Sequence, residues 1–96
     1  MSEFLESAAA ELNEKLAGAD IGGTVKFAIA GEGTIFVDDS GARVGDDEAD
    51  VTLSADAETF KGIFDGEVNP TGAFMAGQLT VDGDMGLAMK LAGVLS

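Results

Sequence analysis

The segment "GDMGLAMKLAGVL", residues 83–95, holds one acid and one base in a chain otherwise crowded with carboxylates. From Met85 onward its apolar residues follow the helical period in two neighbouring stripes, with Lys90 as almost the whole polar face. The stripes are Leu87, Leu91 and Leu95, and beside them Met85, Ala88, Met89 and Ala92. Such a helix needs cover on nearly all sides, so the fold has to supply a sheet face and then further helices, a second chain or a molecule that is not protein.

Alternating apolar residues predict five strands to form that sheet. The segments are "GTVKFAIAG" (23–31), "TIFVDD" (34–39), "ARVG" (42–45), "ADVTLS" (49–54) and "QLTVDG" (78–83). A "GEG" turn predicts a hairpin from the first two, and the close succession of the first four predicts a meander. In the fifth strand we expect Leu79 and Val81 to point inward.

Capping residues predict the limits of the helices. An amphipathic helix opens the chain, a second one carries Phe60, Ile63 and Phe64 at helical spacing, and a third is only a turn or two long. The predicted N-cap and stop are Ser2 and Gly18 for the first helix, Asp56 and Gly66 for the second, and Asn69 and Gly77 for the third. Pro70 is expected in the first turn of the third helix, and Asp84 is the predicted N-cap of the final helix.

The charge of the chain excludes several kinds of partner. Eighteen acids against five bases give a formal net charge of −13. A field of this sign repels nucleic acid and anionic lipid surfaces, so we expect neither nucleic-acid binding nor strong docking to anionic membranes. The first residues lack the pattern of a signal peptide, and no apolar stretch approaches the ~20 residues that span a bilayer. We therefore expect a single cytoplasmic domain over residues 1–96.

The residue types that carry most enzyme chemistry are missing. The chain has no His, Cys, Trp or Tyr, so it lacks the usual general base, the thiol nucleophile and the common zinc ligands. The acidic run from Asp46 to Asp50 fails as a calcium loop, because Val51 replaces the turn glycine and Ala57 the bidentate glutamate. We expect no enzyme activity, no cofactor and no metal, and a solvated acidic loop.

The C-terminal third resembles a known family. Over residues 68–91, "VNPTGAFMAGQLTVDGDMGLAMKL" is similar to the signature of the sterol carrier protein 2 (SCP-2) family, in which a "G-x-x-N-P" turn leads through "AFM-x-G" to "G-x-M-G-x-A-M-K-L". The matching positions are Gly66, Asn69, Pro70, Ala73, Phe74, Met75, Gly77, Gly83, Met85, Gly86, Ala88, Met89, Lys90 and Leu91. The earlier part of the chain fits the family more loosely. The resemblance implies an α+β fold, with a five-stranded, mainly antiparallel sheet covered on one face by helices.

The resemblance also implies a function, the non-enzymatic binding and transfer of fatty acids, fatty acyl-CoA or sterols in an apolar tunnel between sheet and helices. The candidate lining is Phe60, Ile63, Phe64, Phe74, Met75, Leu79, Val81, Met85, Leu87, Met89, Leu91 and Leu95. The three methionines suit a space whose contents change shape, although scattered methionines also fill core gaps. The alternative is an interaction or accessory module, for example in quinone or lipid metabolism, that uses the apolar final helix. A carrier predicts a monomer, and an interaction module an associating species such as a weak dimer.

Overall fold

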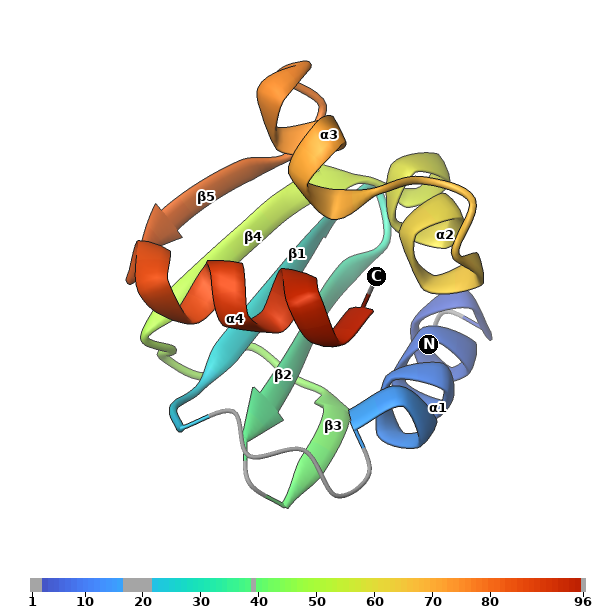
Figure 1. Ribbon diagram of the computed structural model, residues 1–96. Coiled ribbons are helices and arrows are strands. Elements are labelled where there is room, and N and C mark those ends of the chain that lie inside the picture. Colours follow the sequence, from blue (N-terminus) through green and yellow to red (C-terminus); the bar gives the residue numbers. More distant parts are fainter. Residues whose placement is uncertain (1–2, 17–21, 39, 96) are drawn as a thin grey trace.

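The computed structural model describes residues 3–16, 22–38 and 40–95, without the side chain of Leu95 (Figure 1). The elements in chain order are α1 (Glu3–Leu16), β1 (Val25–Ala30), β2 (Gly33–Asp38), β3 (Gly41–Val44), β4 (Val51–Asp56), α2 (Ala57–Asp65), α3 (Pro70–Met75), β5 (Thr80–Gly83) and α4 (Met85–Leu95). The predicted α+β fold with a five-stranded, mainly antiparallel sheet is confirmed.

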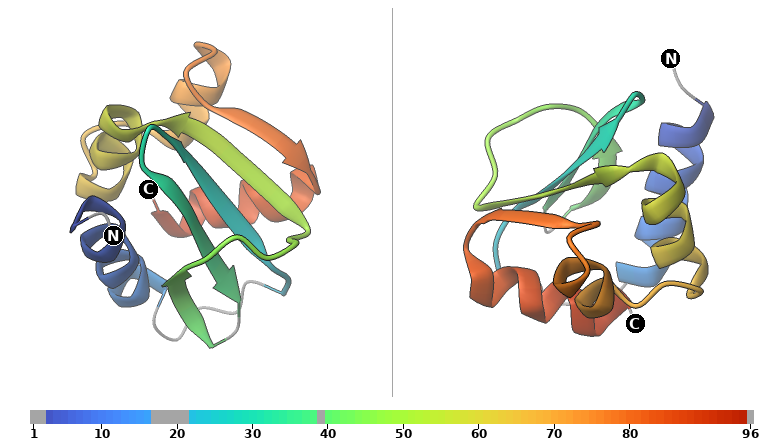
Figure 2. Two further views of the ribbon diagram at one scale, coloured as in Figure 1. Left: turned by 180° about the vertical axis from the view of Figure 1, so that it is seen from behind. Right: turned by 90° about the horizontal axis from the view of Figure 1, so that it is seen from above.

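The sheet has the strand order β3-β2-β1-β4-β5. β1 pairs with β4 in parallel, and the other neighbours are antiparallel. The predicted meander is therefore wrong, because the chain passes from edge strand β3 back across the sheet to β4. An alternating pattern predicts which face a residue occupies, but not which strand lies beside which. α4 crosses one face of the sheet, and a view from behind shows the other face free of helices (Figure 2).

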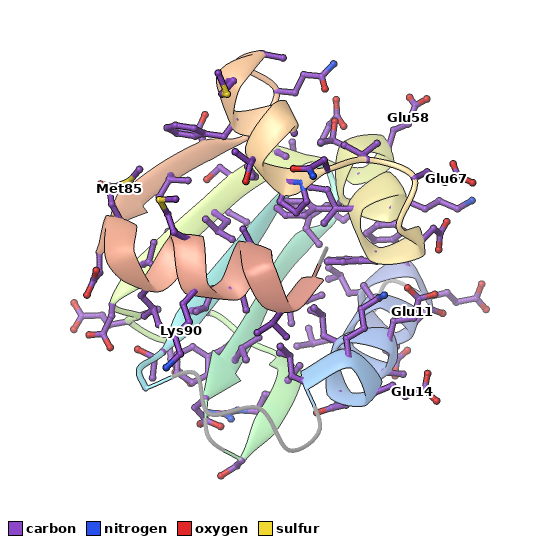
Figure 3. All side chains as sticks on the ribbon, in the orientation of Figure 1. Glu11, Glu14, Glu58, Glu67, Met85 and Lys90 are labelled. Carbon is purple, nitrogen blue, oxygen red and sulfur yellow. The ribbon has the colours of Figure 1, made fainter. Side chains whose placement is uncertain are left out.

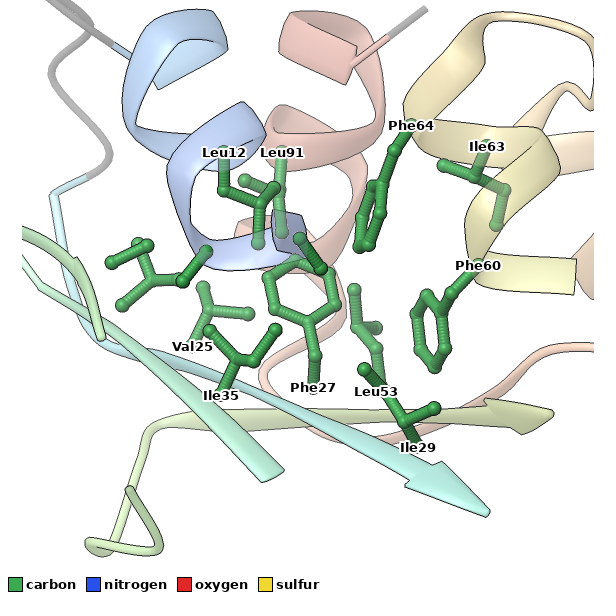
Figure 4. Packing of buried hydrophobic residues seen from close by; sticks show 14 of the residues in the cluster. Leu12, Val25, Phe27, Ile29, Ile35, Leu53, Phe60, Ile63, Phe64 and Leu91 are labelled. Atoms are coloured by element: carbon green, nitrogen blue, oxygen red, sulfur yellow. The ribbon is translucent and has the colours of Figure 1, made fainter. Parts of the chain in front are cut away.

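The core lies between the sheet and the helices (Figure 4). At its centre is Phe27 of β1, whose ring meets those of Phe60 and Phe64 of α2 edge to face, with ring centroids 5.5 and 5.9 Å apart. Leu12 of α1 and Leu91 of α4 close the same cluster and have no exposed surface. The three rings join the central strand to α2, so this packing fixes where the helical layer sits.

The acidic segment 46–50 belongs to the helix-free side of the sheet. Lys26 points away from the core and forms an ion pair with Asp46, with Nζ 3.0 Å from Oδ1. Arg43 pairs with Asp38 at 3.0 Å, and its guanidinium stands over the ring of Phe36, 4.7 Å from the centroid. Among the described residues no group of three acidic side chains is arranged to hold a metal ion. The segment is the crossover between β3 and β4, held by the bases beneath it.

The predicted N-caps within the described residues are confirmed, and α3 has Ala76 as its C-cap, one residue before the predicted stop Gly77. The side chain of Asp56 accepts the N–H of Thr59 at 2.7 Å, and that of Asn69 accepts the N–H of Thr71 at 2.9 Å. α2 stops at Gly66, which takes the left-handed conformation at φ 84°. The predicted cap Ser2 and stop Gly18 lie outside the described residues.

We expect Phe27→Ala to lower the free energy of unfolding by about 3–5 kcal/mol, because it empties the position that joins β1 to both rings of α2. Phe74→Ala is the control, because that ring is 41% exposed and should contribute less than half as much. Urea unfolding followed by circular dichroism measures both. Equal losses in the two variants would contradict this account of the core.

Candidate functional site

An apolar groove lies between α3, α4 and the β4–β5 edge of the sheet. It encloses about 80 Å³. Its lining consists of Leu53, Pro70, Thr71, Phe74, Leu79, Val81, Met85, Ala88, Met89 and Ala92. Thr71 alone among these has a polar side chain, and none carries a charge. The groove therefore offers contact area to hydrocarbon and almost no means of recognising a polar head group.

The sheet supplies the floor of the groove by extending the core sideways. In the strand register Phe27 stands beside Leu53, and Leu53 beside Val81, so the three side chains share one face. Phe27 is 1% exposed beneath α2, whereas Val81 on the edge strand is only partly buried. Leu53 and Val81 belong to the groove. The groove thus begins where the helices no longer cover the apolar face completely.

The start of α4 is fixed to the sheet by backbone contacts. The N–H of Asp84 donates to the carbonyl oxygen of Asp50 at 3.0 Å, and the Asp84 carboxylate caps the helix by accepting the N–H of Leu87 at 3.1 Å. Gly83 precedes this cap with φ 117°, and a Cβ there would collide with the Asp50 carbonyl oxygen and lie 2.9 Å from Cα of Val51. Only glycine at position 83 lets the end of β5 approach β4 this closely, and this approach sets the direction in which α4 crosses the sheet.

α3 is positioned by its cap and by the turn that follows it. Asn69 accepts the N–H groups of Thr71 and Gly72 at 2.9 and 3.2 Å, and Pro70 is buried in the first turn. After the helix, the N–H groups of Gln78 and Leu79 both donate to the carbonyl oxygen of Ala73, at 2.9 and 3.2 Å. This turn places the buried side chain of Leu79 in the wall of the groove. Leu79 was predicted to lie within the fifth strand, but β5 begins one residue later, at Thr80.

The two stripes of α4 face different surroundings. Leu87 and Leu91 are buried at 7% and 0% exposure and belong to the core. Met85 and Met89 border the groove and remain 45% and 66% exposed. The expectation that Lys90 makes up nearly the whole solvent face is wrong, because α3 covers only part of the outer side of α4 and leaves Met85 and Met89 exposed.

The structure distributes the twelve predicted lining residues over three surroundings. Five line the groove: Phe74, Leu79, Val81, Met85 and Met89. Five lie in the packed core away from it: Phe60, Ile63, Phe64, Leu87 and Leu91. Met75 is 81% exposed on α3, and the side chain of Leu95 lies outside the described part of the chain. A role in lipid binding stays a prediction for all twelve.

Five lining residues were not anticipated: Leu53, Pro70, Thr71, Ala88 and Ala92. Ala88 and Ala92 lie on the methionine stripe of α4, so the helical period contained the signal for them. Leu53 reaches the groove through its pairing with Val81, and no local pattern contains that information.

Asp38 and Asp56, two carboxylates with a lowered pKa, lie outside the groove lining. The Arg43 side chain, then the N–H of Ser40, lowers the pKa of Asp38 by hydrogen bonding. The Thr59 side chain and its N–H lower the pKa of Asp56 at the start of α2. Because the lining residues contain no titratable side chain, protonation within the groove does not alter its affinity for uncharged hydrocarbon.

Comparison with known proteins decides the family of the chain. Residues 2–96 match the SCP-2 sterol transfer family. The chain belongs to that family. It is also 45% identical over 82 residues to hydroxysteroid dehydrogenase-like protein 2 of Danio rerio, an alignment that covers 77% of the chain and 20% of the relative. The chain therefore spans about a fifth of the length of this curated relative.

Solved structures show the same fold. Sterol carrier protein 2 of Aedes aegypti, determined in complex with the C16 fatty acid palmitate, aligns with a TM-score of 0.80 at 21% identity over 100% of this chain and 97% of that one. The sterol carrier protein domain 2 of Helicoverpa armigera aligns with a TM-score of 0.79 at 23% identity, over 96% and 85% of the two chains. The SCP-2-like fold inferred from the resemblance is thus confirmed.

We expect Gly83→Ala to lower the free energy of unfolding by about 1–3 kcal/mol, because the added methyl group meets backbone atoms that cannot move aside. The control is Gly93→Ala in α4, where a Cβ has open space and the higher helix propensity of alanine should add up to about 1 kcal/mol. Thermal unfolding of the two variants should shift in opposite directions. A stabilised Gly83→Ala variant would show that β5 does not need this close approach.

Proposed function

We propose that this SCP-2 domain is a non-enzymatic lipid carrier that takes the hydrocarbon chain of a fatty acid, a fatty acyl-CoA or a sterol into the groove between α3, β5 and α4. The supporting observation is the lining itself, in which nine of the ten residues are apolar and two are methionines at the opening. Burial contributes roughly 0.8 kcal/mol per CH2, so a long acyl chain reaches micromolar affinity without polar contacts. The Aedes aegypti structure with palmitate gives a precedent within the fold.

The size of the groove favours a flexible ligand. Pockets for small molecules usually enclose about 300–1,000 Å³, whereas this groove encloses about 80 Å³. Ligand entry therefore requires Phe74, Met85 and Met89 to move, and all three are 41% exposed or more. Methionine has three rotatable bonds and little packing to lose at such a position, so the groove can widen along an acyl chain. A rigid sterol needs a wider opening at once, so we rank acyl chains before sterols.

A second candidate function is an accessory module that presents its ligand to an enzyme. The observation that favours it is the shared sequence with a much longer relative whose name is dehydrogenase-like, of which this chain spans 20%. The same groove serves both functions, and the two differ in whether the lipid leaves to a membrane or to a catalytic domain. In either case we propose a monomer in the cytoplasm, with no catalytic residue of its own.

A titration of delipidated protein with an environment-sensitive fluorescent fatty acid tests the carrier function. The absence of Trp and Tyr keeps the protein's own fluorescence low. We expect saturable binding at one site, displaced by unlabelled fatty acid and fatty acyl-CoA more readily than by sterol. Absence of displaceable binding by the folded protein would refute the carrier and leave an interaction module.

We expect Met89→Glu to fold and to bind the fatty acid at least about tenfold more weakly, because it places an unpaired carboxylate at the groove. Leu91→Glu is the contrasting variant on the same helix, since a charge at its fully buried position should abolish folding. Circular dichroism and the same titration measure both. Wild-type folding and uptake in both variants would show that α4 faces the other way.

A further inference from the structure

The outer edge of the groove is an exposed apolar surface. Among the described residues five large apolar side chains are exposed, and four of them lie on α3 and α4. We call these four the rim: Phe74 (41% exposed), Met75 (81%), Met85 (45%) and Met89 (66%). Three of them also line the groove, so the rim surrounds its opening. Three exposed apolar side chains around one groove, with a fourth on the same short helix α3, are typical of a contact site.

Most of the acidic residues lie outside the segment of the chain that carries the rim. Residues 1–67 hold sixteen of the acids and four of the bases, a net charge of −12. Residues 68–96, which form α3, β5 and α4, hold two acids and one base, a net charge of −1. Figure 3 shows Glu11, Glu14, Glu58 and Glu67 on the side of α1 and α2, away from Met85. Sixteen of the eighteen acids thus lie outside the segment that carries the rim, although the exposed Asp84 directly precedes Met85.

The occupant that fits this face is a lipid surface without net charge. A second copy of the chain carries −13 of its own and is repelled at long range, and an anionic membrane is repelled in the same way. A protein interface usually centres on Trp, Tyr or Arg, and the rim has none of these. Phenylalanine and methionine at the opening of the proposed hydrocarbon-binding groove match the acyl region of a bilayer.

We propose that the rim docks the protein onto zwitterionic bilayers, with the groove opening directed at the acyl chains. This inference rests on the proposed carrier function for its purpose, but the docking step itself does not require a bound ligand. The apolar side chains of the rim enter the interface, and the acidic part of the chain stays in water. The docking strength therefore falls when anionic lipid is added.

The test uses the delipidated 96-residue chain and its Met75→Glu and Val44→Glu variants with phosphatidylcholine vesicles. Met75 does not line the groove in the structure, so we expect its replacement to weaken docking more than fatty-acid binding in solution. Val44 is the matched control, because it is 41% exposed on β3, the edge strand opposite β5, and its replacement adds the same charge. Flotation measures docking, and the fluorescent titration measures the groove separately.

We expect the wild type and Val44→Glu to float with phosphatidylcholine vesicles, and Met75→Glu to partition about tenfold less, because it loses one buried methionine and adds a charge. Met75→Gln, which adds no charge, should lie between them and serves if the glutamate variant misfolds. Mixing phosphatidylglycerol into the vesicles should weaken flotation of the wild type, and added salt should reverse part of that loss.

Three results would overturn the docking proposal: a wild type that binds fatty acid but does not float, Met75→Glu that floats like the wild type, or equal losses in Met75→Glu and Val44→Glu. The first would leave the rim to a protein partner. Loss of flotation confined to Met75→Glu, in a protein that binds no fatty acid, would support docking while refuting the carrier function. The two proposals therefore fail separately.

Discussion

The parallel pairing of β1 with β4 determines the place of every other element. Two parallel neighbours cannot be joined by a tight turn, so the chain forms β2 and β3 before it returns to the middle of the sheet. The return runs along residues 45–50 on the helix-free side, where Asp46 meets Lys26. Because this crossover occupies one side, α1, α2 and α4 pack on the other, and β5 adds an edge beside β4. The acidic run, which has no metal-binding pattern, is explained by this position.

The core and the groove lie on the same face of the sheet, and they differ in how completely the helices cover that face. Phe27 lies under two rings of α2, whereas Leu53 and Val81, next in the same row, line the groove together with residues of α3 and α4. Leu87 and Leu91 of α4 belong to the core, so this helix cannot leave without exposing Leu91. Met85 and Met89 on the neighbouring stripe have no comparable packing, since they are 45% and 66% exposed. Movement at the groove therefore concerns side chains before it concerns the helix.

How much of this could be predicted from sequence depends on the range of the interaction. Caps such as Asp56, Asn69 and Asp84 act within three residues, so their patterns predicted them correctly. The strand order depends on contacts between distant segments, and the prediction of a meander was wrong. For the site, helical spacing indicates that Phe60 and Phe64 are buried. It does not distinguish a ring that packs on Phe27 from one that meets a ligand. Ala88 and Ala92 stand on the methionine stripe, but a small side chain gives no local sign of whether it meets a ligand or another helix.

The position of the rim favours widening of the narrow groove where the groove faces a membrane. In water, moving Met85 and Met89 aside exposes the apolar lining, which is unfavourable in proportion to the area uncovered. Against the acyl region of a bilayer, the same movement exposes the lining to hydrocarbon, and that cost largely disappears. If the rim docks as proposed, contact with the membrane lowers the free energy of opening without any hinge or head-group signal. The acidic part of the chain then limits this contact to surfaces of low charge, so the net charge of −13 selects the membrane while the rim provides the attachment.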